Sequence, residues 1–264
     1  TDITNTHTPG KTSVNVLKVW DDAENQDGVR PGSIEVILLA NDEEFETKTL
    51  DATNNWQTDF SDLDEYKNGK KIVYTVKEVE NDGYESLITG DADNGFVVKN
   101  THEPATISIN GIKTWDDNDN QDGKRPESIT VNLMVNGVVI DHVRVSAETD
   151  WSYAFTDLPQ FEKGQEIDYV IQETGVEEYQ PGYVTEVNPE TSDQTVNILN
   201  THTPGKTSVT VNKVWDDADN QDGLRTDEVI IKLLADGEET GKTVTLSPEN
   251  NWQDIFTDLD EYQD

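Results

Sequence analysis

The chain has 264 residues, and its 55 acidic residues against 19 basic residues give a formal charge of −36. So acidic a surface repels phosphate backbones and anionic lipid headgroups, so we expect no nucleic-acid partner and no membrane insertion. Cysteine is absent, which excludes disulfides, thiolate nucleophiles and cysteine-ligated metal centres. The longest apolar run, Ile34 to Ala40, contains Glu35 and is too short to span a bilayer.

The chain repeats itself at intervals of 95 and 100 residues, since the block KVWDDAENQDGVRP at Lys18 returns in similar form at Lys113 and Lys213. Repeats of this length indicate an array of similar domains. We therefore expect a piece of a longer array, divided into the last strand of a preceding repeat, two complete repeats and the first part of a further one: residues 1–7, 8–102, 103–202 and 203–264. The last three segments are called unit 1, unit 2 and unit 3 below.

Within unit 1, apolar and polar residues alternate with the period of a β-strand. Alternating stretches include those that begin at Val14, Ile34, Ile72 and Phe96, and Asp-Gly and Asn-Gly turns follow several of the strands. Short strands, such turns and the lack of a long helical pattern predict an all-β sandwich of about a hundred residues in each unit. Short proline-containing joints, such as Thr-His-Glu-Pro-Ala after Asn100, predict a semi-rigid rod of neighbouring repeats.

An acidic loop follows the first strand of each unit. The three copies are Asp21–Asp27, Asp116–Asp122 and Asp216–Asp222. Their oxygen-rich side chains are typical of calcium ligands, although the spacing misses the EF-hand pattern by one residue. The alternative, which we favour, is a turn in which the following arginine, such as Arg30, pairs locally. No other cofactor is expected.

A tryptophan recurs in the middle of each unit, with a phenylalanine four residues later, as Trp56 and Phe60 illustrate. Such aromatic pairs could form a platform on which a sugar stacks. Because each pair recurs in the same frame as a strand, packing in the core is the better interpretation.

Three strands of each complete unit carry a polar residue that is in phase with the apolar face. In unit 1 these residues are Lys18, Glu78 and Asn100, and in unit 2 they are Lys113, Glu173 and Asn200. The lysine and the glutamate are 60 residues apart in both units. Unit 3 contributes only Lys213, and Asn5 is the only such residue of the first segment.

Burying an unpaired ammonium costs several kcal/mol, so a lysine that recurs in this phase needs an explanation. One interpretation is a buried Lys–Glu ion pair with the asparagine as a hydrogen-bond partner, or a lysine that reaches solvent at the strand end. The other is chemical, because burial favours a neutral amine and a neutral acid. The amine could then attack the asparagine Cγ while the glutamate relays a proton to the departing ammonia.

The blocks KVWDDADNQDG, YTVKEVENDGY and FVVKNTH resemble the B-type repeats of the staphylococcal collagen adhesin and related Gram-positive surface proteins and pilins. The resemblance implies a transthyretin-like, inverse immunoglobulin-type sandwich with a spontaneous Lys–Asn isopeptide bond. It assigns the bond to Lys18 and Asn100 with Glu78, and to Lys113 and Asn200 with Glu173. Lys213 and Asn5 lack their partners and should stay unlinked. The Glu-to-Asn separation is 27 residues in unit 2 and 22 in unit 1, which leaves the three reactive residue types unchanged.

The resemblance also implies an extracellular stalk, anchored to the cell wall, that displays a host or matrix ligand-binding region elsewhere in the protein. The partners of these repeats would be the neighbouring repeats of the same chain, and the chain would not be an enzyme beyond its own cross-linking. The alternative is that the repeats bind a host ligand directly, with calcium in the acidic loops.

Overall fold

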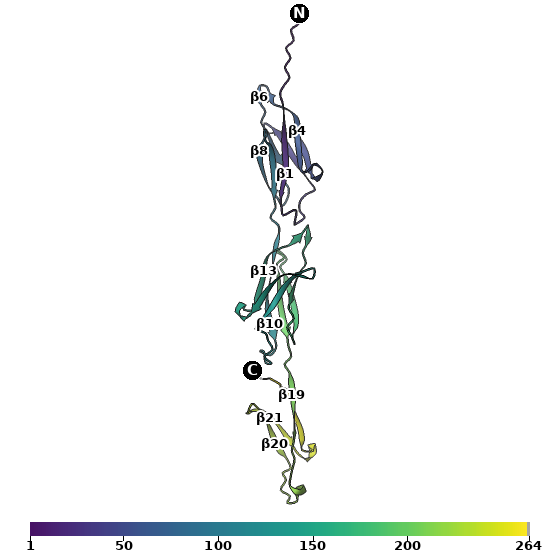
Figure 1. Ribbon diagram of the computed structural model, residues 1–264, viewed down its shortest axis with the longest axis vertical. Coiled ribbons are helices and arrows are strands. Elements are labelled where there is room, and N and C mark those ends of the chain that lie inside the picture. The colour runs from purple at the N-terminus through teal and green to yellow at the C-terminus, as the bar shows by residue number, and fades with distance from the viewer. Residues whose placement is uncertain (263–264) are drawn as a thin grey trace.

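The structure, a computed structural model, describes residues 1–262 as an elongated file of β-rich units placed end to end (Figure 1). Unit 1 contains these elements: β1 (Lys11–Asp21), β2 (Ser33–Ala40), β3 (Glu43–Asp51), η1 (Ala52–Asn54), β4 (Gln57–Asp64), β5 (Tyr66–Lys67), β6 (Lys70–Lys71), β7 (Tyr74–Glu78), β8 (Glu85–Asp91) and β9 (Gly95–Thr101). The prediction of an all-β fold in a rod is confirmed.

Unit 2 repeats this order with β10 (Thr106–Asp116), β11 (Ser128–Val135), β12 (Val138–Ser146), η2 (Ala147–Thr149), β13 (Ser152–Pro159), β14 (Phe161–Glu162), β15 (Gln165–Glu166), β16 (Tyr169–Glu173), β17 (Gln180–Val187) and β18 (Gln194–Thr201). Unit 3 contains β19 (Lys206–Asn212), η3 (Ala218–Asn220), β20 (Val229–Ala235), β21 (Glu238–Leu246), η4 (Pro248–Asn250) and β22 (Gln253–Asp260). Each η element is a single 3₁₀ turn. None of the helices in the described part is long and apolar enough to cross a membrane.

Each complete unit packs a four-stranded sheet on a three-stranded sheet. In unit 1 the strand orders are β4-β1-β9-β8 and β3-β2-β7, and unit 2 has the equivalent orders. The first strand, β1, lies inside its sheet, antiparallel to β4 and parallel to the last strand, β9. Because parallel neighbours point the same way, the chain enters the sandwich at one end and leaves it at the other. This arrangement explains the end-to-end file in Figure 1.

The core lies between the two sheets, where the alternating residues predicted from the sequence face inward. Val14, Val36 and Val98 are fully buried, and their strands form one continuous apolar cluster with the rest of unit 1. Unit 2 builds an equivalent cluster around Ile109 and Val131. Burial of this kind is the main stabilising contribution to such a sandwich, about 25 cal/mol for each Å² of apolar surface removed from water.

The first and last segments differ from the complete units. Residues 1–7 were predicted to resemble a last strand, but they form no strand, and Ile3 is 90% exposed. Strands need hydrogen-bonded neighbours, and no described residue pairs with this segment. In unit 3, Val209 is 43% exposed, whereas its unit 1 equivalent, Val14, is fully buried. The described part of unit 3 holds two separate two-stranded sheets, β19-β22 and β20-β21, without strands equivalent to β7 and β9.

Units 1 and 2 contact one another directly at their joint. The turn between β14 and β15 of unit 2 meets the acidic loop of unit 1, where Gly164 N donates a hydrogen bond to Gln26 O at 2.9 Å. A Cβ atom on Gly28, whose φ is +72°, would lie only 2.5 Å from Gly164 Cα. Glycine at both positions therefore lets the two backbones approach within van der Waals distance.

Replacing Gly28 by alanine should therefore tilt unit 1 away from unit 2. The matched control is Gly123→Ala in the equivalent loop of unit 2, where φ is +64° but no described residue lies within 4 Å of the added Cβ. Both variants carry the left-handed strain of about 1–2 kcal/mol, so only the contact distinguishes them. Spin labels at Thr47→Cys and Thr156→Cys, placed in a chain with no other cysteine, should report a shifted distance for Gly28→Ala alone. Equal distances in both variants would contradict the contact.

Candidate functional site

The three in-phase polar residues of unit 1 meet inside the sandwich. Lys18 Nζ lies 3.2 Å from Glu78 Oε1, and Asn100 Nδ2 donates to the same oxygen at 3.0 Å. The side chain of Lys18 is 0% exposed and that of Glu78 is 3% exposed, and Asn100 is 1% exposed as a residue. A single carboxylate oxygen therefore contacts both the amine and the amide nitrogen, with almost no access to solvent.

Unit 2 brings together the equivalent residues. Lys113 Nζ lies 3.5 Å from Glu173 Oε2, and Asn200 Nδ2 donates to Glu173 Oε1 at 2.7 Å. The Lys113 and Glu173 side chains are 0% and 1% exposed. The longer Glu-to-Asn separation of unit 2 still leaves the three groups in contact, because the extra residues all lie within the hairpin of β17 and β18. The lysine and the amide of unit 2 contact different oxygens of the carboxylate, whereas those of unit 1 share one.

The strand register explains this meeting of residues that are distant in sequence. Trp20 on β1 pairs with Asn100 on β9, so Lys18, two residues earlier on β1, points to the same face as the asparagine. Glu78 ends β7 and reaches the site from the opposite sheet, across the core. Two sheets and three strands must therefore pack correctly before the three groups touch.

Burial controls the electrostatics of the two lysines. Desolvation lowers the pKa of Lys18 to about 8, and the neighbouring Glu78 carboxylate opposes this shift. The pKa of Lys113 also falls to about 8 for the same reason. Each ammonium lies over an indole ring, with Lys18 Nζ 4.3 Å from the centroid of Trp20. A large fraction of the amine is therefore neutral near pH 8, and a neutral amine is a nucleophile.

The two single candidates lie apart from any such cluster. Asn5 is exposed, and Lys213 comes one residue after the end of β19, where its Nζ faces the Val214 carbonyl oxygen at 3.4 Å. Neither residue has a described glutamate partner. That Asn5 and Lys213 stay unlinked remains a prediction.

A second buried cluster, which sequence reasoning only half identified, lies beside the first. Arg30 donates to both carboxylate oxygens of Asp22, from Nε at 2.9 Å and from Nη2 at 2.5 Å, and Tyr84 donates to Oδ2 at 2.8 Å. The arginine, above all, lowers the pKa of Asp22 to about 2. Tyr84 also packs edge-on against Trp20, with centroids 5.0 Å apart. Trp20 therefore connects this cluster with Lys18, whose Nζ lies over the same indole ring.

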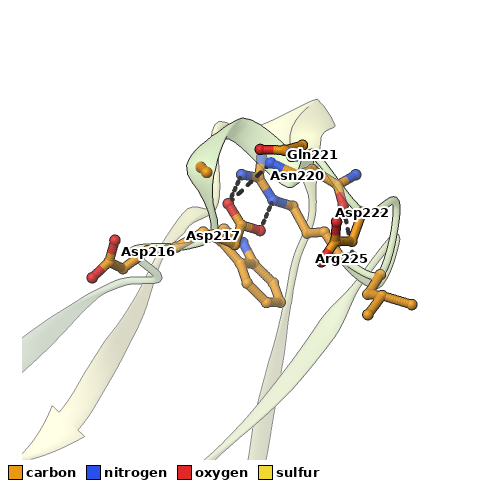
Figure 2. A pocket seen from close by; sticks show the side chains of 9 residues that line it. Asp216, Asp217, Asn220, Gln221, Asp222 and Arg225 are labelled. Atoms are coloured by element: carbon orange, nitrogen blue, oxygen red, sulfur yellow. Dashed lines mark hydrogen bonds and ion pairs between the residues drawn. The ribbon is translucent and has the colours of Figure 1, made fainter.

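The local Arg–Asp turn is confirmed in all three units. Arg125 donates to Asp117 with the same geometry, and Figure 2 shows Arg225 reaching over the loop to Asp217. Among the described residues no group of three or more carboxylate or imidazole side chains is arranged to hold a metal ion. The carboxylates of Asp22 and Asp117 each contact an arginine and a tyrosine.

Tyr84 was not identified from the sequence, although an aspartate and a tyrosine recur at the same separation in both complete units. Its contact with Asp22 spans 62 residues, and Tyr179 contacts Asp117 across the same interval in unit 2.

The predicted core role of the aromatic pairs is confirmed, since Phe60 is fully buried and Trp56 packs against the unit 1 core.

Comparisons with known proteins relate the chain to one family of repeats. The family profile described as Cna protein B-type domain matches residues 14–101, 109–201 and 209–264. The collagen adhesin of Staphylococcus aureus is 44% identical over 263 residues, which are 99% of this chain but only 21% of that protein. The crystal structure of two B repeat units of the collagen binding protein of S. aureus is 42% identical, with a TM-score of 0.62, over 96% of this chain and 66% of that one. The chain thus spans about a fifth of the curated relative.

Proposed function

Because the chain belongs to the family of Cna protein B-type domains, we propose that it is a structural stalk segment of a Gram-positive surface adhesin or pilus-like protein. Units 1 and 2 each lock themselves with one Lys–Asn isopeptide bond. The observation that carries this proposal is the contact of one Glu78 oxygen with both Lys18 Nζ and Asn100 Nδ2.

The reaction balances within the three side chains. The neutral Lys18 amine attacks Asn100 Cγ, and the new C–N bond forms as the C–Nδ2 bond breaks. Glu78 takes the proton that the amine loses and delivers it to the departing nitrogen, which leaves as ammonia. The lowered lysine pKa and the hydrogen bond from Asn100 Nδ2 to Glu78 support these roles. Packing holds the groups together, and such intramolecular positioning reaches effective concentrations of about 10⁵–10⁸ M.

The position of the bond supports a mechanical role. Lys18 lies on the strand that enters the sandwich and Asn100 on the strand that leaves it, and the two strands are parallel neighbours. Tension along the chain would therefore pass from β1 through the covalent bond into β9. Closing a loop of this size also removes unfolded-state entropy, by analogy with disulfides about 4–5 kcal/mol, which suits a chain without cysteine.

The rest of the assignment follows from this role. We infer an extracellular location with a cell-wall anchor outside this chain, neighbouring repeats as the direct partners, and a host or matrix ligand that binds elsewhere in the protein. The division into residues 1–7, 8–102, 103–202 and 203–264 is part of the proposal. The bond forms once and does not turn over, so the chain is not an enzyme in the usual sense.

Intact mass spectrometry tests the bond directly. The folded wild type should weigh less than its sequence by two ammonia molecules, one from each complete unit. Glu78→Ala should restore one of them and the double variant Glu78→Ala/Glu173→Ala both, because the proton relay is lost while Lys and Asn remain. Glu43→Ala, at an exposed glutamate, is the control and should keep the wild-type mass deficit. A folded wild type of full sequence mass would leave only the ion-pair interpretation.

A further inference from the structure

Each joint between units contains a histidine held on both ring nitrogens. In the first joint His102 Nδ1 lies 2.8 Å from the Gly83 carbonyl oxygen, and Nε2 lies 2.9 Å from Asp27 Oδ2. The same Asp27 oxygen accepts a hydrogen bond from Ala105 N, in the linker to unit 2, at 2.8 Å. Asp27 therefore connects the last strand of unit 1 to the first residues of the next unit.

The second joint repeats the arrangement with different neighbours. His202 Nδ1 lies 3.0 Å from the Glu178 carbonyl oxygen, and Nε2 lies 3.1 Å from Asp122 Oδ2. Gly205 N in the following linker donates to the same oxygen at 2.9 Å. Both histidine side chains are largely buried, 18% exposed for His102 and 10% for His202. A geometry that recurs in two joints is a property of the repeat.

The hydrogen-bond partners determine the protonation of these rings. A carbonyl oxygen can only accept, so Nδ1 must carry a proton in both joints. The bond between Nε2 and the carboxylate then needs a second proton, which a neutral imidazole with a protonated Nδ1 lacks. Both hydrogen bonds of each ring therefore need one proton more than a neutral imidazole carries. The histidine and the aspartate share this extra proton.

We infer that His102 and His202 are proton-dependent clasps that stiffen the rod by holding each linker against the preceding unit. When the extra proton is present, the ring, the aspartate and the linker amide form one connected group. When it leaves, the neutral ring turns a lone pair toward the carboxylate, and the bond between strand and loop is replaced by repulsion. The inference concerns the joints and is independent of the cross-link.

The sign of the pH dependence follows from the histidine pKa values. The hydrogen bond to Asp27 raises the pKa of His102, with a further contribution from the Gly83 carbonyl, and Asp122 does the same for His202. A raised pKa in the folded state means that the clasp contributes fully below the unfolded value of about 6.5 and is lost as the pH rises through the folded value. The rod should therefore be stiffer in mildly acidic than in alkaline solution.

The other groups around each ring do not reverse this sign. The nearest charged or titratable groups around His102 are Asp27, Asp22 with its partner Arg30, and Tyr84, whose ring centroid is 5.4 Å away. Glu85 and Glu103 line the same hollow. Lys163 lies beside Gly164, in the turn of unit 2 that packs on the acidic loop of unit 1. Around His202 they are Asp122, Asp116, Tyr179, Lys206, and Glu178 with its partner Lys124. Carboxylates outnumber free cations in both sets, and they favour the protonated ring.

The chain supplies its own controls for a test by NMR. His102 and His202 lie in different joints, so each is the control for a change made at the other. Titration of the imidazole ¹⁵N signals in the full chain should show both rings losing their protons above the ordinary histidine value of about 6.5. Asp27→Asn should lower the titration point of His102 and leave that of His202 unchanged, because the neutral amide no longer stabilises the protonated ring of His102.

Spin labels at Thr47→Cys and Thr156→Cys, one on each side of the first joint, connect protonation to stiffness. The inter-label distance distribution should broaden as the pH rises through the His102 titration, and in Asp27→Asn it should no longer follow pH in this way. If His102 loses its proton at or below the ordinary histidine value of about 6.5, or if the wild-type distribution keeps its width while His102 loses its proton, the clasp is overturned.

Discussion

Pulled from its two ends, the wild-type chain should show no unfolding step for unit 1 or unit 2. Each bond would remove the residues between its ends from the path of the force, and those residues number 81 between Lys18 and Asn100. Glu78→Ala should restore a step of about 280 Å, at about 3.5 Å for each released residue. Single-molecule force spectroscopy measures this length directly.

The two glutamates make the experiment self-controlled. Glu78→Ala should add one step and leave unit 2 inextensible, whereas Glu173→Ala should free the 86 residues between Lys113 and Asn200 and leave unit 1 inextensible. The loss of the carboxylate also leaves a buried lysine unpaired, so the freed units should yield at low force. Steps of these lengths in the wild type would show that its units open without covalent restraint.

A second large effect is expected from Gly111→Ala in β10. A Cβ atom at this position would lie 1.9 Å from the backbone oxygen of Val196 and 2.8 Å from the Tyr153 hydroxyl. Backbone cannot yield as a flexible side chain can, so the unit 2 sandwich should lose about 4 kcal/mol or more. Calorimetry should show a lower melting temperature for the unit 2 transition, and Gly182→Ala, where the nearest atom is 3.7 Å away, should change it little.

Unit 2 is sensitive at this position because Gly111 and Tyr153 together replace the pair of residues that unit 1 has there. Unit 1 has Val16 and Thr58 as the paired residues at these positions. In unit 2 the tyrosine hydroxyl donates to Val196 O at 2.5 Å, in a stretch where β10 and β18 lose their regular pairing. The double variant Gly111→Val/Tyr153→Thr, which restores the unit 1 pair, should therefore cost less than the sum of its single variants. If the stability costs of the two single variants simply added up in the double variant, the coupling between Gly111 and Tyr153 would be contradicted.

Much of the fold could be predicted from the sequence because strand periodicity and repetition are local signals. The phase of Lys18 and Asn100 on their strands predicted that both side chains point into the core, and they do. The phase of Glu78 likewise predicted its place, because its strand alternates up to that residue. The parallel pairing of β1 with β9 was not predicted, because contact among three buried polar groups does not say which of their strands share a sheet.

The joints and the closing cluster could not be predicted in the same way. His102 meets Asp27 across 75 residues, and both belong to irregular segments in which no periodicity fixes the direction of a side chain. Gly28 has an equivalent in Gly123, yet only the contact with Gly164 gives it a role between units. Residues of this kind depend on the path of loops and on the neighbouring unit, which a single repeat does not encode.

The parallel pairing of the first and last strands has a consequence for how such proteins lengthen when repeats are added. A fold whose ends emerge side by side would turn the chain back on itself with every added copy. Here each duplication of about a hundred residues carries the chain forward by one body length, with the reactive residues included. Copy number alone can then set the length of the rod, without any change in the sequence of the unit.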